Sequence, residues 1–228
     1  MFLVSQYDGG YTFTLAIQAN MNDLARYALI CQSEGLMPIV QPGISLKGTH
    51  SLEVAAEVNI KVQSVLFQAL REHNVYLPGC TMKSTMANPG IDCVTAYSVY
   101  EIAAANIFVL QQSFPVSMKG THFLSGGQTF GQAAARLTAM NELKAKASEK
   151  NDNPNSDDKK YECPCNLSFS WSAAIQLPLL DLCKGRDGVL PLNEMSEMYI
   201  DRLRIAALAA TGKWHQNLNK NDGNHCGK

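Results

Sequence analysis

The stretch Leu36-Met37-Pro38-Ile39-Val40-Gln41 predicts a short buried strand, which Pro42-Gly43 is expected to end. A helix is expected before it, from about Asn20 to Ser33, because apolar residues share one face at helical spacing. A longer helix is expected after it, from about Ser51 to His73, and Cys80-Thr81-Met82-Lys83 then predicts a second strand end. Two strands joined by a crossover helix pair in parallel, so this unit predicts a parallel sheet.

The alternation continues along the chain. Further strands are expected at Gly120–Ser125 and Leu167–Ser170, and further helices at Ser98–Gln112, Gly131–Lys144 and Glu194–Ala210. The strand ends Gln41, Lys83, Ser125 and Ser170 are 42, 42 and 45 residues apart, which fits one strand and one helix per period. Four such units form either an open sheet or half of an eight-stranded barrel. An open doubly wound sheet usually has a glycine-rich turn after its first strand, which is absent here.

The composition argues against several function classes. The chain has 228 residues, 46% of them apolar and 17% charged, with a formal net charge of −1, so it can bury a core but has no cationic surplus for nucleic acid. No apolar run is long enough to span a membrane. The N-terminal residues Met1–Asp8 lack a basic segment before their apolar run, and a secretory signal is therefore not expected.

The seven cysteines are odd in number and mostly scattered, which favours reduced thiols, several of them filling the core. Cys163-Pro164-Cys165 has the wrong spacing for a zinc ligand pair, and no metal site is expected. Residues 145–162 are charged and predict a mobile, solvated insertion, and residues 216–228 predict a polar tail.

The ends of the predicted strands carry the candidate chemistry, because barrel active sites lie at the carboxyl ends of strands. Lys83 ends an apolar strand, where a partly buried amine can form a Schiff base with a carbonyl, although a lysine on a barrel rim is the plainer alternative. Ser125-Gly126-Gly127 offers a hydroxyl and backbone N–H groups to an anion, although an ordinary turn has the same composition.

The chain contains four longer motifs, which are L-A-R-Y-A-x-I-C-Q at Leu24–Gln32, P-I-V-x-P at Pro38–Pro42, K-x-x-M-x-x-P-G at Lys83–Gly90 and F-L-S-G-G-Q at Phe123–Gln128. Together these motifs resemble those of class I fructose-bisphosphate aldolase and occur in that family's order. The resemblance is continuous from Ile17 to Gln128 and weaker from Leu167 to Trp214.

The resemblance implies a parallel α/β fold of the TIM-barrel type, with residues 1–228 forming a single partial domain that holds strands five to eight. It also implies reversible cleavage of fructose 1,6-bisphosphate to two triose phosphates in glycolysis, in the cytoplasm, with no metal or cofactor. Lys83 matches the Schiff-base lysine, and Ser125 and Gly126 match the site for a substrate phosphate. A phosphorylated sugar is the expected substrate, and no nucleic acid or membrane partner is expected.

The chain departs from the family at several of these positions. Gln41 replaces the acid/base glutamate, Gly43 a second glutamate and Ala173 the phosphate-binding arginine, while Ser84 replaces a proline after the lysine. The family's C-terminal tyrosine is missing, and Met1 aligns one position after a lysine on the fourth strand. The alternative expectation is therefore a weak or inactive, truncated aldolase-like chain. Such a chain would either act as a partner subunit, in a homo-oligomer or with a full-length aldolase, or have no independent role.

Overall fold

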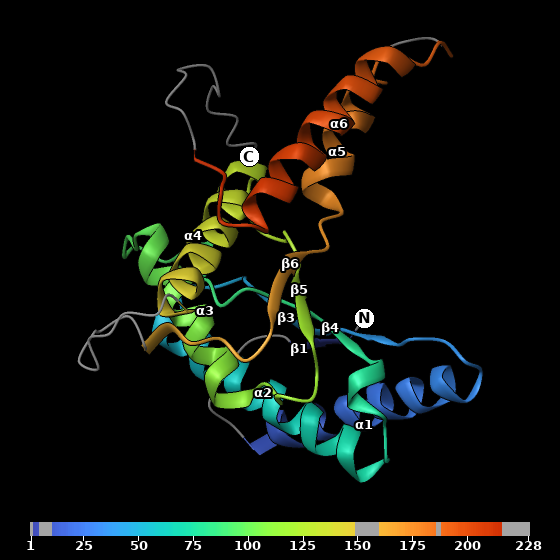
Figure 1. The fold of residues 1–228 in the computed structure, drawn as a ribbon, viewed down its shortest axis with the longest axis vertical. Coiled ribbons are helices and arrows are strands. Elements are labelled where there is room, and N and C mark those ends of the chain that lie inside the picture. The colour runs from blue at the N-terminus through green and yellow to red at the C-terminus, as the bar shows by residue number, and fades with distance from the viewer. Residues whose placement is uncertain (1, 5–10, 149–159, 186–187, 216–228) are drawn as a thin grey trace.

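The computed structural model describes residues 2–4, 11–148, 160–185 and 188–215, and within these residues the fold is built on a parallel sheet. Four strands follow one another in the order β2-β4-β5-β6, and every neighbouring pair is parallel. Their bounds are Ile39–Val40 for β2, Thr81–Ser84 for β4, Gly120–Phe123 for β5 and Asn166–Phe169 for β6. The predicted parallel sheet is confirmed, and each strand is joined to the next by a helix (Figure 1).

A second, two-stranded sheet corrects one prediction. Pro42-Gly43 does not end the strand region, because Pro42–Ile44 forms β3, which pairs in parallel with β1 at Phe2–Val4. Proline lacks an N–H donor and is tolerated at the first residue of a strand, which is the place that Pro42 takes in β3. The backbone therefore changes its pairing partner at Gln41, from β4 to β1.

Four helices cover one face of the four-stranded sheet and pack against each other in chain order (Figure 1). They are α1 at Tyr11–Ser33, α2 at Leu52–Glu72, α3 at Val99–Ser113 and α4 at Phe130–Ser148. A 3₁₀ turn, η1 at Leu77–Gly79, precedes β4. Helix α1 begins nine residues before the predicted Asn20, and Ile17, in the added part, is buried and extends the apolar face of the helix.

The predicted helix ends are confirmed where a side chain fixes them. Ser51 accepts a hydrogen bond from the Val54 N–H at the start of α2. Ser98 and Glu101 form the predicted capping box at the start of α3, since each side chain bonds to the backbone N–H of the other residue. Asn74 follows α2 with φ of 57°, the left-handed conformation expected of it.

Two helices follow β6, and the first was not predicted. Helix α5 covers Ala173–Asp181 and α6 covers Leu192–Ala209, and the two lie side by side beyond the end of the sheet (Figure 1). The sequence does not predict α5 because the helix contains Pro178. A proline inside a helix leaves the carbonyl four residues earlier without its hydrogen-bond donor. That carbonyl belongs to Ala174, and it accepts a hydrogen bond from Arg202 Nη1 of α6 at 2.7 Å. The tertiary contact thus supplies the donor that the proline removes.

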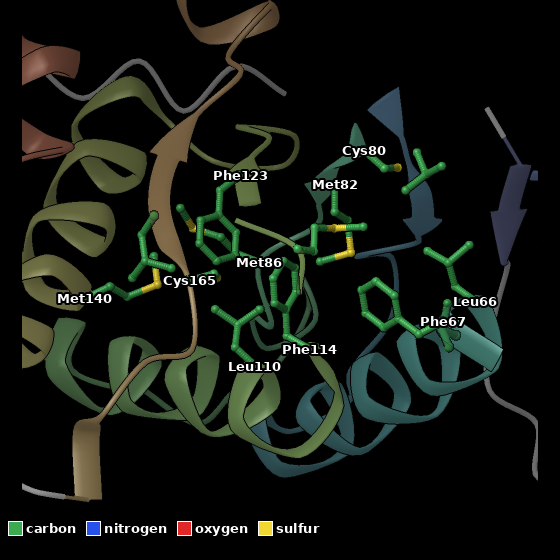
Figure 2. Packing of buried hydrophobic residues seen from close by; sticks show 14 of the residues in the cluster. Leu66, Phe67, Cys80, Met82, Met86, Leu110, Phe114, Phe123, Met140 and Cys165 are labelled. Carbon is green, nitrogen blue, oxygen red and sulfur yellow. The ribbon is translucent and has the colours of Figure 1, made fainter. Parts of the chain in front are cut away.

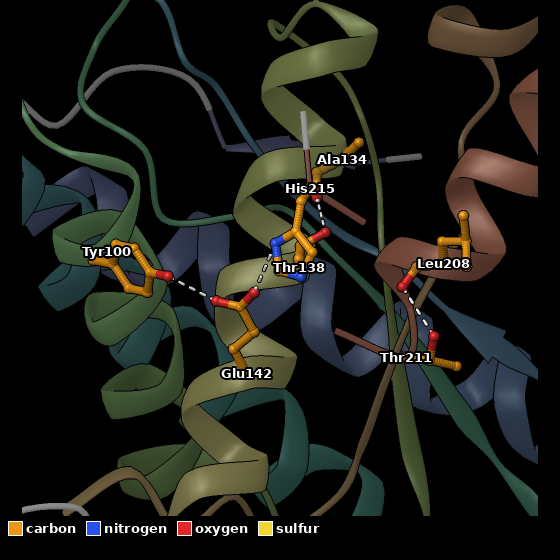
Figure 3. Close-up of polar contacts among 7 residues, drawn as sticks. All are labelled: Tyr100, Ala134, Thr138, Glu142, Leu208, Thr211 and His215. Carbon is orange, nitrogen blue, oxygen red and sulfur yellow. Dashed lines mark hydrogen bonds and ion pairs between the residues drawn. The ribbon is translucent and has the colours of Figure 1, made fainter. Parts of the chain in front are cut away.

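Helix α4 is tied to its neighbours by one carboxylate. Tyr100 of α3 donates to Glu142 Oε2 at 2.7 Å, and His215 Nδ1, after α6, lies 3.5 Å from Glu142 Oε1 (Figure 3). The bond to the carboxylate raises the pKa of the Tyr100 phenol, because it holds the phenolic proton in place. Helix α4 also runs to Ser148, so the first part of the expected insertion is helical, while residues 149–159 and the tail at 216–228 lie outside the described residues.

The core lies between the sheet and these helices. Met82 of β4 and Phe123 of β5 are almost completely buried, and Phe67 meets Phe114 edge to face with ring centroids 5.4 Å apart (Figure 2). Cys80 and Cys165 are buried in the same cluster, which confirms that some thiols fill the core. No helix in the described part of the chain is long and apolar enough to cross a bilayer.

The thiols differ sharply in their protonation. A hydrogen bond from the Cys165 thiol, assisted by Lys144, lowers the pKa of Cys163 to about 7, although burial opposes the shift. The same hydrogen bond and burial raise the pKa of Cys165. Burial raises the pKa of Cys80 to about 11. The thiolate is the reactive form, so Cys163 and Cys80 differ in reactivity near neutral pH.

The first prediction concerns these thiols. Alkylation of Cys163 by iodoacetamide should accelerate as pH rises to about 7 and then level off, because the thiolate fraction saturates above the pKa. Cys80 should stay unreactive over the same range. Peptide mass mapping after timed labelling measures both rates, and Cys163→Ser is the control. Equal labelling of the two thiols between pH 6 and pH 8 would contradict the assignment.

The second prediction concerns the open sheet. In the described residues, β2 and β6 are the outer strands of the sheet, and Ile39 of β2 is 51% exposed on the face opposite the helices. Unpaired strand edges and exposed apolar residues favour association, so the 228-residue chain should sediment as an oligomer at micromolar concentration. Ile39→Lys should shift the distribution toward monomer, whereas Ile91→Lys, at a loop position 63% exposed, should not. A concentration-independent monomer would contradict this.

Candidate functional site

The predicted site residues gather at the carboxyl ends of neighbouring strands. Gln41 follows β2 directly, Lys83 is the third residue of β4, and Ser125 and Gly126 follow β5. Val40 pairs with Met82, so Gln41 and Lys83 each follow one residue of that pair. Lys83 itself pairs with His122 of β5. The fold therefore places Gln41 and Lys83 at the same ends of two adjacent strands.

The alternation of β4 decides which way Lys83 faces. Met82 and Ser84 are buried toward the helices, whereas Lys83 lies between them on the opposite face and is half-buried. Ser84 is fixed there by Gln63 of α2, whose Nε2 donates to its hydroxyl at 3.3 Å. Lys83 makes no hydrogen bond or ion pair with any other described residue. Among the described residues, nothing therefore occupies the amine on the open face of the sheet.

A polar row crosses the same face on three strands. His122 pairs with Lys83 on one side and with Ser168 of β6 on the other. All three side chains are half-buried, while Thr121 and Phe123, which flank His122, are buried toward the helices. His122 is not among the site residues predicted from the sequence. The sequence could have indicated it, because side chains alternate along a strand. Phe123 is apolar and faces the helices, so its neighbour His122 is expected on the opposite face.

Ser125 and the glycines after it form a tight turn against α5. Ser125 is 3% exposed, and its hydroxyl accepts a hydrogen bond from the Ala174 N–H at 3.4 Å, in the first turn of α5. Gly127 has φ of 71°, a left-handed conformation that favours glycine at this position of the turn. The predicted turn residues thus face a helix N-terminus, where backbone N–H groups accumulate.

Helix α5 begins at Ala173, beside Ser125, so this position presents a methyl group and no cation. A pocket of about 180 Å³ lies next to it, beyond the end of β6. Its lining residues are Phe169, Ser170, Trp171, Ile175, Gln176, Tyr199 and Leu203. Within the described ranges, no three side chains of the histidine, cysteine, aspartate and glutamate types come together in a cluster that could hold a metal ion.

The loop that follows Lys83 is held by a buried amide that sequence analysis missed. Asn106 of α3 is 2% exposed, its Oδ1 accepts from the Ala87 N–H at 2.8 Å, and its Nδ2 donates to the Ala87 carbonyl at 3.0 Å. Both backbone groups of a buried loop residue are thereby satisfied by one side chain. The clamp fixes the path of the chain as it leaves β4. A lone asparagine in an apolar helix is the signal that could have indicated it.

Comparison with known proteins gives one consistent family. The model of fructose-bisphosphate aldolase class-I matches residues 4–226. A probable fructose-bisphosphate aldolase class 1 of Xylella fastidiosa (strain 9a5c) is 36% identical over 200 residues, which cover 88% of this chain and 54% of that protein. The fructose-bisphosphate aldolase of Dictyostelium discoideum is also 36% identical, over 88% of this chain and 51% of its own length.

A solved structure agrees with the sequences. Fructose-bisphosphate aldolase of Plasmodium falciparum, crystallised with TRAP and a small-molecule inhibitor, is 32% identical with a TM-score of 0.76, covering 88% of this chain and 52% of that chain. The predicted (β/α) barrel type is therefore confirmed, with the described sheet as part of a barrel. The chain spans about half the length of the curated relatives it matches.

The third prediction concerns the clamp at the site. Asn106→Ala should lower the free energy of unfolding by about 2 to 4 kcal/mol, because it leaves the buried Ala87 N–H and carbonyl without partners. Asn59→Ala is the matched control, since Asn59 is equally buried but donates only to Ala55 within its own helix. Equilibrium urea unfolding measures both variants. Equal losses would show that Asn106 contributes no more than a helical asparagine.

Proposed function

This chain belongs to the class I fructose-bisphosphate aldolase family, and we propose on that basis that Lys83 is its Schiff-base lysine. The carrying observation is the position of Lys83 at the end of β4, half-buried, on the open face of the sheet and beside Gln41. The proposed ligand is the ketone of a triose or hexose phosphate. The family's place in glycolysis and a cytoplasmic location belong to the same proposal.

The chemistry of Lys83 starts with the neutral amine, which attacks the ketone carbon and forms an iminium with loss of water. The iminium withdraws electrons from the neighbouring carbon–carbon bond. That bond can then break without forming a free carbanion, and the electron pair moves onto the nitrogen. No metal is needed for this step, because the protonated nitrogen accepts the charge.

The substrate phosphate is proposed to bind at Ser125 and Gly126. The Ser125 hydroxyl and the backbone N–H groups of the turn are suitable neutral donors, and the first turn of α5 lies against them. Ala173 contributes no guanidinium, so the phosphate lacks a charged bidentate donor at this position. We therefore expect the phosphate to bind weakly and the ketone to be less well positioned over Lys83.

The cleavage step is expected to be slow. Gln41 stands where the family has its acid/base glutamate, and an amide forms hydrogen bonds but does not exchange protons at neutral pH. Loss of one acid/base group typically costs a factor of about 10² to 10⁴ in rate. The proposed function is therefore Schiff-base formation by Lys83 with weak carbon–carbon cleavage.

A second candidate function is that of a partner subunit. The observation that favours it is the sheet itself, in which β2 and β6 have no further strand beside them within the described residues. Pairing with a second copy or with a full-length aldolase would cover the Ile39 face. This role requires no turnover and is compatible with an unreactive Lys83.

The fourth prediction tests the amine. Incubation with dihydroxyacetone phosphate and sodium borohydride should attach one reduced ketone to Lys83, as located by peptide mass mapping. Lys83→Arg should abolish the adduct, because a guanidinium does not form an iminium. Lys119→Arg, next to β5, should leave it unchanged. A coupled assay should give cleavage far slower than that of a complete aldolase.

Two results would contradict the proposal. Absence of any adduct on Lys83 in the folded protein would remove the Schiff-base assignment and leave the partner-subunit role. Cleavage at the rate of a complete aldolase would refute the expected cost of Gln41 and Ala173.

A further inference from the structure

We propose that His122 is the proton-transferring residue of this site and carries the acid–base chemistry that Gln41 cannot perform. The inference rests on the proposed function of Lys83 and names a second side chain for the same reaction. It is drawn from the register of β4 and β5 and from the faces that their side chains occupy.

The register sets His122 directly beside Lys83. The two residues are paired across parallel neighbouring strands, which lie about 4.8 Å apart, and paired residues project to the same face of a sheet. Met82 and Thr121, the preceding pair, are both buried toward the helices. Lys83 and His122 therefore share the open face.

The surroundings of His122 leave its ring available. On its other side it is paired with Ser168, a small side chain, and His122 itself is half-buried. His122 makes no hydrogen bond or ion pair with any other described residue. A buried structural histidine normally bonds its ring nitrogens to protein groups. An imidazole without such partners, beside the proposed nucleophile, is placed to exchange protons with a bound ligand.

The proton balance of iminium formation shows what His122 would do. The ammonium of Lys83 gives one proton to the neutral imidazole, and the free amine then forms its bond to the ketone carbon. The carbonyl oxygen takes one proton from the attacking nitrogen and becomes a hydroxyl group, which leaves as water after it receives a second proton from the imidazolium. One ammonium and one ketone thus give one iminium and one water, and His122 ends in its starting form.

Gln41 lies on the other side of Lys83 and complements this role. Gln41 follows Val40, which pairs with Met82 of β4, whereas His122 on β5 is paired with Lys83 from the other side of β4. The amide can orient the ketone or the carbinolamine hydroxyl by a hydrogen bond but cannot carry its proton. The site would then use a different strand for proton transfer from the one that holds the family's glutamate.

The test measures the rate of iminium formation on Lys83 under single-turnover conditions. Dihydroxyacetone phosphate and cyanoborohydride are added to the full chain, and the adduct is quantified over time by mass mapping. His122→Ala and His122→Asn should each slow adduct formation by a factor of about 100 or more, as expected for loss of an acid–base group. His73→Asn is the control. His73 caps the C-terminus of α2 and lies outside the sheet, so this variant should form the adduct at the unaltered rate.

Chemical rescue separates proton transfer from a structural effect. Imidazole added to the solution should restore part of the lost rate in His122→Ala and should not accelerate the unaltered chain. Circular dichroism must show the same fold for each variant, and His122→Asn keeps a polar side chain of similar size if His122→Ala fails to fold.

The outcomes distinguish the two proposals. No adduct on the unaltered chain would overturn the Lys83 proposal, and this inference with it. A normal adduct rate in both His122 variants would overturn only the inference. A slow rate in His122→Ala that imidazole does not restore would reduce His122 to a residue that packs against the site.

Discussion

The parallel register of β2, β4, β5 and β6 is the constraint on which the rest of this structure depends. Val40, Met82, Phe123 and Leu167 are buried against the helices, and together they fix which face of each strand is apolar. Because strand side chains alternate with a period of two, a slip of one residue would expose this set and bury Lys83. Packing of the helices against the apolar face of the sheet thus determines which residues lie on the opposite face, where Lys83 is found.

Polar contacts on the helical side of the sheet also fix the position of the residues next to Lys83. Asn106 clamps Ala87 after β4, and Gln63 holds Ser84 beside Lys83, so the strand end is fixed from the helical side. The α5 N-terminus is held in the same manner, by Ser125 from one side and by Arg202 from the other. These bonds satisfy buried groups on the helical side of the sheet, whereas Lys83 and His122 lie on the open face and bond to none of the residues that the structure describes.

The departures from the aldolase motifs fall at positions for which we propose roles in proton transfer and phosphate binding. Gln41 offers an amide in place of a carboxylate, and Ala173 offers a methyl group in place of a guanidinium. Lys83 and the Ser125-Gly126-Gly127 turn are present in the sequence. The chain forms part of a barrel and spans about half the length of its curated relatives.

The sequence by itself determined the parallel sheet, the positions of most helices and, to within two residues, the strand ends near Gln41, Lys83 and Ser125. These features depend on local periodicity, on caps such as Ser98 with Glu101, and on motif spacing, all of which are contiguous in the chain. Roles for the site residues came from the family resemblance and remain proposals.

Only the tertiary structure decided the pairing of Lys83 with His122, the Asn106 clamp and the existence of α5. Each joins residues that are far apart in the sequence: His122 reaches Lys83 through strand pairing, and Arg202 supplies the hydrogen bond that Pro178 removes from α5. Likewise, β3 exists because Pro42–Ile44 meets β1, although the local sequence signals a turn. Local propensity is a weak preference, and long-range hydrogen bonds and burial override it where the two disagree.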